Sequence, residues 1–294
     1  MALNLATFRK RTLTAAIFVV VMLTGLLWNH WSFFVLFSII HFGCWIEYQS
    51  LIGKIDPGYA AITPLHKYGV MLAGWCILLY FTSDELFTLF GMHLHELGWW
   101  MGLLFLFLLP IVEFLFAGKF QLKNIGYSAL GLLYISLSWG LMIDLRSSWG
   151  GSQVDIVDKD RLFFPLLLIG TIWINDTMAY IVGSLIGKTP LSSISPKKTW
   201  EGTAGGALLA IITVTLIWIW QFTSQLWWHI SIIALIATIA GTFGDLLESK
   251  LKRLAGVKDS GAIMPGHGGF LDRFDSLLIA TPFVWLYLMI MINS

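Results

Sequence analysis

Residues 227–247 read WWHISIIALIATIAGTFGDLL, an apolar run that ends in Gly244 and Asp245 and is followed directly by Glu248. A helix that spans a membrane needs about 20 mostly apolar residues, and this run supplies them. Asp245 and Glu248 are three residues apart, so on a helix they share one face. The run therefore predicts a membrane-spanning helix with two carboxylates at one end.

Similar apolar runs recur along the whole chain. Of its 294 residues, 57% are hydrophobic and 12% are charged, whereas soluble domains carry roughly 25% charged residues. We therefore predict an all-α, polytopic integral membrane protein. We place about nine transmembrane helices at 12–29, 31–47, 68–90, 97–116, 126–144, 162–186, 203–222, 227–247 and 273–293. We expect one membrane domain, 1–294, in which 1–160 is mainly hydrophobic scaffold and 170–281 is the catalytic region.

The lysines and arginines predict the orientation. If the N-terminus is cytoplasmic and the nine runs alternate, 15 of the 18 lysines and arginines fall on the cytoplasmic side. The positive-inside rule favours this topology. The net charge of +1 gives no global basic field of the kind that nucleic acid attracts, so we expect no nucleic-acid partner.

The segment 244–276 carries most of the unusual polar chemistry. Carboxylates at a membrane boundary are costly unless they are paired, hydrated or bound to metal. Two hypotheses stay open: the carboxylates converge on a divalent cation such as Mg²⁺, or each pairs with a nearby base such as Lys250 or Arg253. The four carboxylates are Asp245, Glu248, Asp272 and Asp275.

Between these carboxylates lie a basic stretch and a glycine-rich turn. The basic residues either anchor the chain at the cytoplasmic face or bind phosphate. Glycine lets the backbone approach a phosphate closely, and the turn leads into a helix N-terminus, which favours anions. The basic residues are Lys250, Lys252, Arg253 and Lys258, and the turn contains His267, Gly268 and Gly269.

A second group of polar residues lies at 175–206. Asp176 lies inside a predicted span, where an ionisable residue is a functional candidate. The loop after it contains Ser195, Lys198 and Thr199. We expect the next helix to begin at Thr199 or Trp200; ordinary loop and capping chemistry is the alternative interpretation of this segment.

Several of these residues form one long pattern. It runs Ser249-x-Leu251-Lys252-Arg253, Lys258-Asp259, and His267-Gly268-Gly269-x-x-Asp272-Arg273-Phe274-Asp275. This pattern resembles that of the phosphatidate cytidylyltransferases, also called CDP-diacylglycerol synthases. The resemblance extends to Asp176, Ala179, Tyr180, Gly183, Gly187, Lys188, Ser195-Pro196-x-Lys198-Thr199-Trp200-x-Gly202, Arg11 and Glu47. Asn175 and Lys197 depart from the pattern, which bears on substrate preference.

The resemblance implies a nucleotidyltransferase that transfers CMP from CTP to phosphatidate, giving CDP-diacylglycerol and pyrophosphate. It implies Mg²⁺, with a monovalent cation such as K⁺ sharing the site. It also implies a homodimer in the membrane lipid of a bacterial inner membrane, with an active site facing the cytoplasm. Asp245 and Asp272 correspond to the principal metal ligands. The catalytic candidates are Asp245, Asp272, Lys252, Arg253, Lys258, His267, Arg273 and Asp275. The substrate-binding candidates are Asp176, Ser195, Lys198, Thr199, Glu248, Lys250, Gly268 and Gly269.

Two other functions stay open at this stage. A related transferase or kinase acting on an isoprenoid lipid would need similar acidic and basic groups with a different acceptor. An ion-coupled transporter would use Asp176 and the boundary carboxylates as an ion path. The absence of a visible inverted repeat in the sequence and the clustering of ionisable residues at one membrane face argue against transport.

Overall fold

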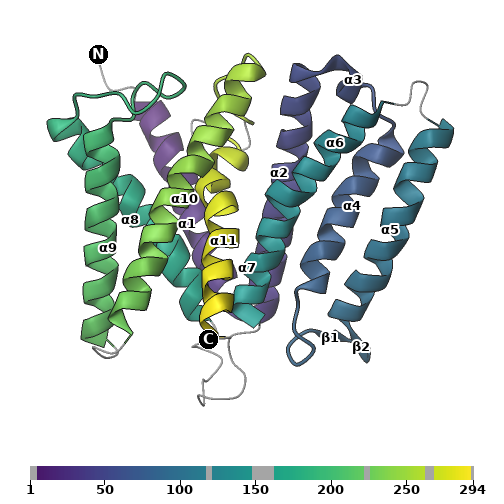
Figure 1. Ribbon diagram of the computed structural model, residues 1–294, viewed down its shortest axis with the longest axis horizontal. Coiled ribbons are helices and arrows are strands. Elements are labelled where there is room, and N and C mark those ends of the chain that lie inside the picture. Colours follow the sequence, from purple (N-terminus) through teal and green to yellow (C-terminus); the bar gives the residue numbers. More distant parts are fainter. Residues whose placement is uncertain (1–4, 117–120, 148–161, 222–225, 262–267, 293–294) are drawn as a thin grey trace. The chain divides into compact units, whose positions relative to one another are not determined.

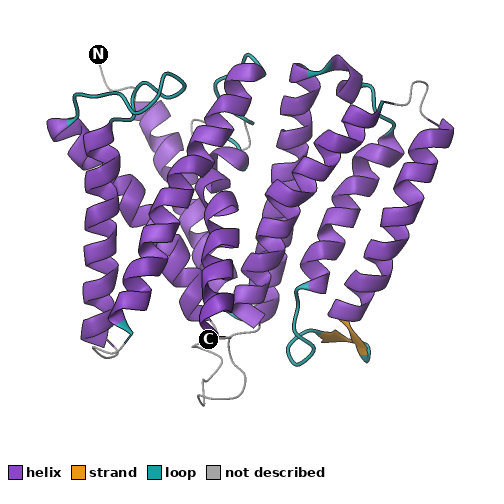
Figure 2. Ribbon diagram, viewed as in Figure 1, coloured by secondary structure: helices purple, strands orange, loops and turns teal. Residues whose placement is uncertain are grey.

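The computed structural model describes residues 5–116, 121–147, 162–221, 226–261 and 268–292. This part of the chain is almost entirely helical, which confirms the predicted fold class (Figure 1). Its two strands form one short hairpin between α4 and α5 (Figure 2). The elements are α1 Leu5–Leu27, α2 His30–Ile55, α3 Pro57–Ala60, α4 Pro64–Tyr80, β1 Thr88–Leu89, β2 Met92–His93, α5 Leu94–Phe116, α6 Leu122–Gly131, the π-helix η1 Leu132–Leu137, α7 Ser138–Ser147, α8 Phe163–Ile186, α9 Trp200–Gln221, α10 Trp227–Leu254 and α11 Leu271–Ile292.

Within the described residues, seven helices are long and apolar enough to cross a membrane. They are His30–Ile55, Leu94–Phe116, Leu122–Arg146, Phe163–Ile186, Trp200–Gln221, Trp227–Leu254 and Leu271–Met291. The chain is thus an integral membrane protein, and the count of nine stays a prediction. Several helices have other bounds than the predicted spans. The span at 68–90 ends at Tyr80 and gives way to the hairpin, and the span at 31–47 continues to Ile55.

The chain folds into two compact units, each built from two separate stretches. Unit 1 comprises Met1–Ser148 and Leu254–Arg273, and unit 2 comprises Trp149–Arg253 and Phe274–Ser294. The loop that links α10 to α11 therefore belongs to unit 1. The single membrane domain expected from the sequence stays a prediction.

Helix α2 forms the buried centre of unit 1. The Trp45 indole N–H donates to Ser136 Oγ at 2.9 Å, and His41 Nε2 lies 3.0 Å from the same hydroxyl. The rings of Phe37 and Trp139 pack with their centroids 5.1 Å apart. Buried polar groups inside a membrane need partners within the protein, and Ser136 of η1 provides one. These contacts fix α2, which carries Glu47 near its end.

Asp56 organises the end of α2. Its carboxylate accepts a hydrogen bond from the Gly58 N–H at 2.9 Å, which caps the short helix α3. Lys123 Nζ, at the start of α6, lies 2.6 Å from the other carboxylate oxygen. The hydrogen bond from Lys123 lowers the pKa of Asp56. The C-terminal end of α2 and the N-terminal end of α6 are thereby held together.

In unit 2, helices α8 and α9 approach closely through small residues. A Cβ atom added at Gly206 would lie 2.7 Å from the Ala179 backbone nitrogen, and one added at Gly202 would lie 2.8 Å from the Ala179 carbonyl oxygen. Small residues at such an interface let two membrane helices pack backbone against backbone. The end of α8 and the start of α9 are therefore held side by side.

This packing predicts that Gly206→Ala destabilises the protein. The added methyl group overlaps the α8 backbone, and overpacking of this kind costs about 1–3 kcal/mol. Gly170→Ala on α8 is the matched control, because no atom lies within 4 Å of a Cβ added there. We expect thermal unfolding in detergent to begin at a lower temperature for Gly206→Ala only. Equal melting temperatures for the two variants would contradict the packing.

The fold also predicts that the two ends of α5 reach opposite faces of the membrane. Phe90 of the hairpin is 93% exposed, and the Lys123 side chain after α5 is 57% exposed. In Phe90→Cys and Lys123→Cys, a membrane-impermeant maleimide should label Phe90→Cys in intact cells and Lys123→Cys only after permeabilisation. Both natural cysteines are buried, so they should give little background. Labelling of both variants from outside would refute the topology.

Candidate functional site

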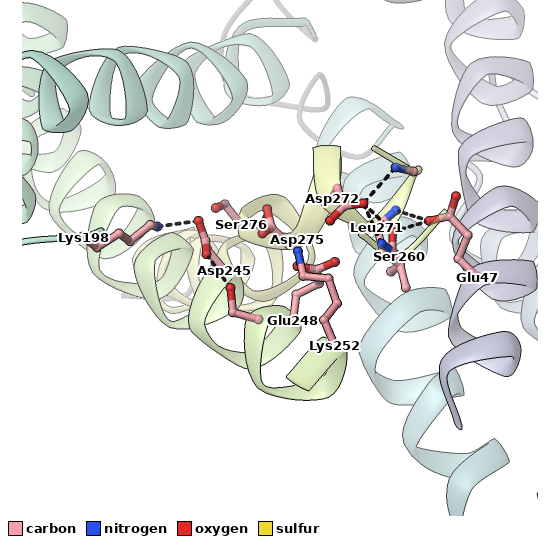
Figure 3. A network of polar contacts seen from close by, with 12 residues as sticks. Glu47, Lys198, Asp245, Glu248, Lys252, Ser260, Leu271, Asp272, Asp275 and Ser276 are labelled. Carbon is pink, nitrogen blue, oxygen red and sulfur yellow. Dashed lines mark hydrogen bonds and ion pairs between the residues drawn. The ribbon is translucent and has the colours of Figure 1, made fainter. Parts of the chain in front are cut away.

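Asp245 of α10 lies at the centre of a charged cluster in unit 2. Its Oδ2 accepts a charge-assisted hydrogen bond from the Lys198 ammonium, and the Ser249 hydroxyl donates to its Oδ1 at 3.3 Å (Figure 3). The sequence suggested Lys250 or Arg253 as pairing partners, five and eight positions further along the same helix. The structure instead pairs Asp245 with a lysine 47 residues upstream.

Two further carboxylates of unit 2 belong to this cluster. Asp176 of α8 interacts electrostatically with Lys198 and Asp245, and Asp275 of α11 interacts with all three. The Asp275 carboxylate also accepts a hydrogen bond from the Ser276 N–H at 2.6 Å. Three of the predicted site residues, Asp176, Asp245 and Asp275, are thus brought together around the predicted substrate-binding residue Lys198. The cluster has more negative than positive charge.

The loop before α9 has a defined conformation that presents Lys198. The Leu191 N–H donates to the Lys198 carbonyl at 2.7 Å, and the Trp200 N–H donates to the Thr189 carbonyl at 2.9 Å. Glu201 accepts hydrogen bonds from the Lys188 and Thr189 backbone, each at 3.2 Å. The helix begins at Trp200 with Glu201 in its first turn, as the sequence predicted.

Two neighbouring site candidates have structural contacts of their own. Thr199 Oγ1 accepts a hydrogen bond from the Gly202 N–H at 3.1 Å, which caps α9. The Ser195 carbonyl accepts from the Lys198 N–H at 3.1 Å. Both residues therefore help to shape the loop, and substrate contact by Ser195 and Thr199 stays a prediction.

The remaining charged candidates differ in exposure. Glu248 is completely buried and forms an ion pair with Lys252, one helical turn further along α10. Four other basic candidates are exposed: Lys250, Arg253, Lys258 and Arg273. His267 lies outside the described residues, as do Lys159 and Arg161 of the predicted outer loops.

A second polar cluster, in unit 1, fixes Asp272 at the start of α11. Asp272 Oδ2 accepts hydrogen bonds from the Ser260 N–H, the Ser260 hydroxyl and the Gly269 N–H, each at 2.8 Å (Figure 3). The carboxylate orientation is thus set by the loop that precedes it. Asp272 belongs to unit 1 and Asp245 to unit 2.

Glu47 of α2 binds the same loop. Its carboxylate accepts from the Phe270 N–H at 2.8 Å, the Leu271 N–H at 2.9 Å and the Ser260 hydroxyl at 2.7 Å. In Figure 3 the Glu47 side chain points towards Ser260 and Leu271. In the sequence, Glu47 stood out only through the resemblance, and Ser260 was not identified as a site residue. An acidic residue inside an apolar run was a usable signal for Glu47, whereas Ser260 carries no sequence signal.

The two predicted glycines have a structural reason to be glycine. Gly268 has φ of +83°, in the left-handed region that other residues seldom adopt. A side chain at Gly269 would overlap the Glu47 carboxylate. The sequence interpretation assigned these glycines to phosphate binding, which stays a prediction, and did not foresee their packing against Glu47 and Asp272.

The donor atoms suit a hard cation, because carboxylate oxygens are the ligands that Mg²⁺ prefers. Within the described residues, no group of three or more His, Cys, Asp and Glu side chains is arranged as a metal site. Mg²⁺ and K⁺ therefore stay predictions for this protein.

Together, the apolar helices and the two polar clusters, one in each unit, define a polytopic helical membrane protein that holds charged side chains in fixed positions. Residues 9–291 match the family described as the cytidylyltransferase family. The chain therefore belongs to the cytidylyltransferase family.

Curated relatives carry a more specific name. The chain is 39% identical over 173 residues to the phosphatidate cytidylyltransferase of Bacillus subtilis, covering 58% of this chain and 60% of that protein. It is 40% identical over 159 residues to the enzyme of that name from Synechocystis, covering 52% and 53%. It is 35% identical over 177 residues to that of Staphylococcus saprophyticus, covering 60% and 64%. The matches thus cover less than two thirds of these relatives.

Proposed function

We propose that this protein transfers CMP from CTP to phosphatidate, giving CDP-diacylglycerol and pyrophosphate for phospholipid biosynthesis. Membership of the cytidylyltransferase family over residues 9–291 carries the proposal, and the names of the relatives supply the acceptor. The cluster of Asp176, Lys198 and Asp245 supports it, because phosphate transfer needs charged groups held in fixed positions.

The proposal also covers the location of the site and the oligomeric state of the protein. The relatives are bacterial, and the distribution of lysine and arginine favours a site on the cytoplasmic side of the inner membrane, where CTP is available. The lipid substrate would reach the site from the membrane. We further propose a homodimer, as the resemblance to the family implies.

Mg²⁺ is the proposed cofactor, with Asp245 and Asp272 as its carboxylate ligands and K⁺ as a possible second ion. When bound, Mg²⁺ would neutralise and orient the nucleotide phosphates. Lys198 is the proposed partner of a substrate phosphate, since its ammonium is already held among the carboxylates of unit 2. The exposed Lys250, Arg253, Lys258 and Arg273 are available to screen the remaining negative charge.

The chemistry needs no strong base. A phosphate monoester is already anionic and nucleophilic near neutral pH. Its oxygen forms a bond to the α-phosphorus of CTP, and the bond from that phosphorus to the bridging oxygen breaks. Pyrophosphate leaves with the electron pair. The obstacle is the repulsion between two anions, so positioning and electrostatics supply most of the acceleration.

We expect Asp245→Asn and Asp272→Asn each to reduce CMP transfer by about 100-fold or more, because each removes a charge that is held in place for the reaction. The measurement uses purified protein, labelled CTP, phosphatidate and Mg²⁺, with detection of a labelled lipid. Asp84→Asn is the control, since Asp84 is an exposed acid in the hairpin region of unit 1. Normal turnover by either folded site variant would remove that residue from the proposed site, and failure of the natural protein to label phosphatidate would refute the function.

We also expect direct transfer without a covalent enzyme intermediate. The acceptor is an adequate nucleophile, and a covalent route needs a nucleophile activated by a partnered base. A single in-line displacement inverts the configuration at phosphorus, whereas two displacements retain it. A chiral α-thio analogue of CTP should therefore give a lipid product with inverted configuration. Net retention, or a nucleotidylated protein isolated in the absence of lipid, would overturn direct transfer and point first to His267.

A further inference from the structure

Glu47 is a buried acid that the proposed reaction does not itself use. It lies in the membrane-spanning helix α2 and is 4% exposed. An ionisable residue inside a membrane is costly and generally has a function. All of the hydrogen bonds recorded for its carboxylate come from residues more than 200 positions further along the chain.

Two of these bonds fix the first turn of α11. The first N–H groups of a helix have no partner within the helix, and a negative charge there is favourable. Leu271 is the first residue of α11, and its N–H donates to Glu47 Oε2 at 2.9 Å. The N–H of Phe270 donates to Oε1 at 2.8 Å. Glu47 therefore caps α11 from another helix and holds the backbone that leads directly into Asp272.

A third bond connects Glu47 to the Asp272 side chain through Ser260. The Ser260 hydroxyl lies 2.7 Å from Glu47 Oε2 and 2.8 Å from Asp272 Oδ2, and its single hydrogen is shared between them. The Ser260 N–H also donates to Asp272 Oδ2 at 2.8 Å. Moving or neutralising Glu47 would therefore change both the loop and the donors that orient Asp272.

The surrounding residues leave space for this arrangement. A Cβ atom at Gly261 or Gly269 would overlap the Glu47 carboxylate, and one at Gly43, a helical turn before Glu47, would overlap the Phe270 ring. Larger residues at these three positions would force α2 and the loop apart. Glycines on both α2 and the loop therefore allow the close contact between them.

We propose that Glu47 is a positioning residue, which acts through Ser260 and the start of α11 to fix the carboxylate of Asp272 for binding a divalent cation. This inference rests on the proposed function for the identity of the cation. Residues that orient a metal ligand typically change metal affinity by about 10–100-fold when they are replaced. In the described contacts, Glu47 reaches Asp272 through Ser260 and the backbone of Phe270 and Leu271, so its proposed role is to orient the ligand.

The test compares three variants of the full-length protein in detergent. Glu47→Gln replaces one acceptor oxygen with an NH₂ group that faces N–H donors, and Ser260→Ala removes only the connecting hydroxyl. Glu113→Gln is the matched control, because Glu113 is also a buried acid in a membrane helix of unit 1, at 2% exposure, and pairs with His66. For each protein, the Mg²⁺ concentration that gives half of the thermal stabilisation is measured, alongside labelled CMP transfer.

We expect the Mg²⁺ midpoint to rise about tenfold or more in Glu47→Gln and in Ser260→Ala, and to stay unchanged in Glu113→Gln. Ser260→Thr, which keeps the hydroxyl, should restore the midpoint. A purely structural role would lower the melting temperature without moving the midpoint. An unchanged midpoint in both Glu47→Gln and Ser260→Ala, an equal shift in Glu113→Gln, or no Mg²⁺ stabilisation of the natural protein would overturn the proposal. Mg²⁺ stabilisation without CMP transfer would refute the proposed function and leave the role of Glu47 standing.

Discussion

A carboxylate buried in a membrane helix must find hydrogen-bond donors, because neither lipid nor water supplies them there. Glu47 finds its donors in Ser260, Phe270 and Leu271. This one set of bonds explains why Leu254–Arg273 folds with unit 1, although the helices on both sides of it continue in unit 2. The bonds to Glu47 add long-range support to the short-range bonds from Ser260 and Gly269 that orient Asp272.

Much of the fold could be predicted because apolar length is a local property. Each long apolar run became a helix, and α9 begins where Thr199 and Trp200 indicated. The errors came where hydropathy alone set a boundary. The predicted span at 68–90 included residues 81–90, which contain Ser83, Asp84 and Glu85, and the chain in fact leaves the helix after Tyr80 and turns through a hairpin, with Gly91 at φ of +81°. Conversely, the span predicted at 31–47 stopped too early: the helix continues to Ile55, and Gln49, beyond the predicted end, donates a hydrogen bond to the Lys67 carbonyl.

The sequence located the polar site residues but not their partners. Pairing of Asp245 with a base close to it in the sequence was one of two hypotheses, the other being convergence of the carboxylates on a divalent cation. Its partner Lys198 lies in the loop between α8 and α9, two helices that pack closely through Gly202 and Gly206. Ser260 shows more clearly that a sequence does not reveal the partners of a side chain. A serine in a loop is unremarkable in a sequence, and its role follows from two carboxylates that approach it from distant parts of the chain.

The charge balance of unit 2 connects this geometry to the proposed chemistry. Among the described residues, Asp176, Asp245 and Asp275 interact around the single ammonium of Lys198. A nucleotide triphosphate would bring still more negative charge, and like charges repel more strongly where water is scarce. Lys198 alone does not balance them. The proposed function gives this excess of carboxylates a role: if the nucleotide entered as a complex with Mg²⁺, the cation would offset the repulsion between its phosphates and these side chains.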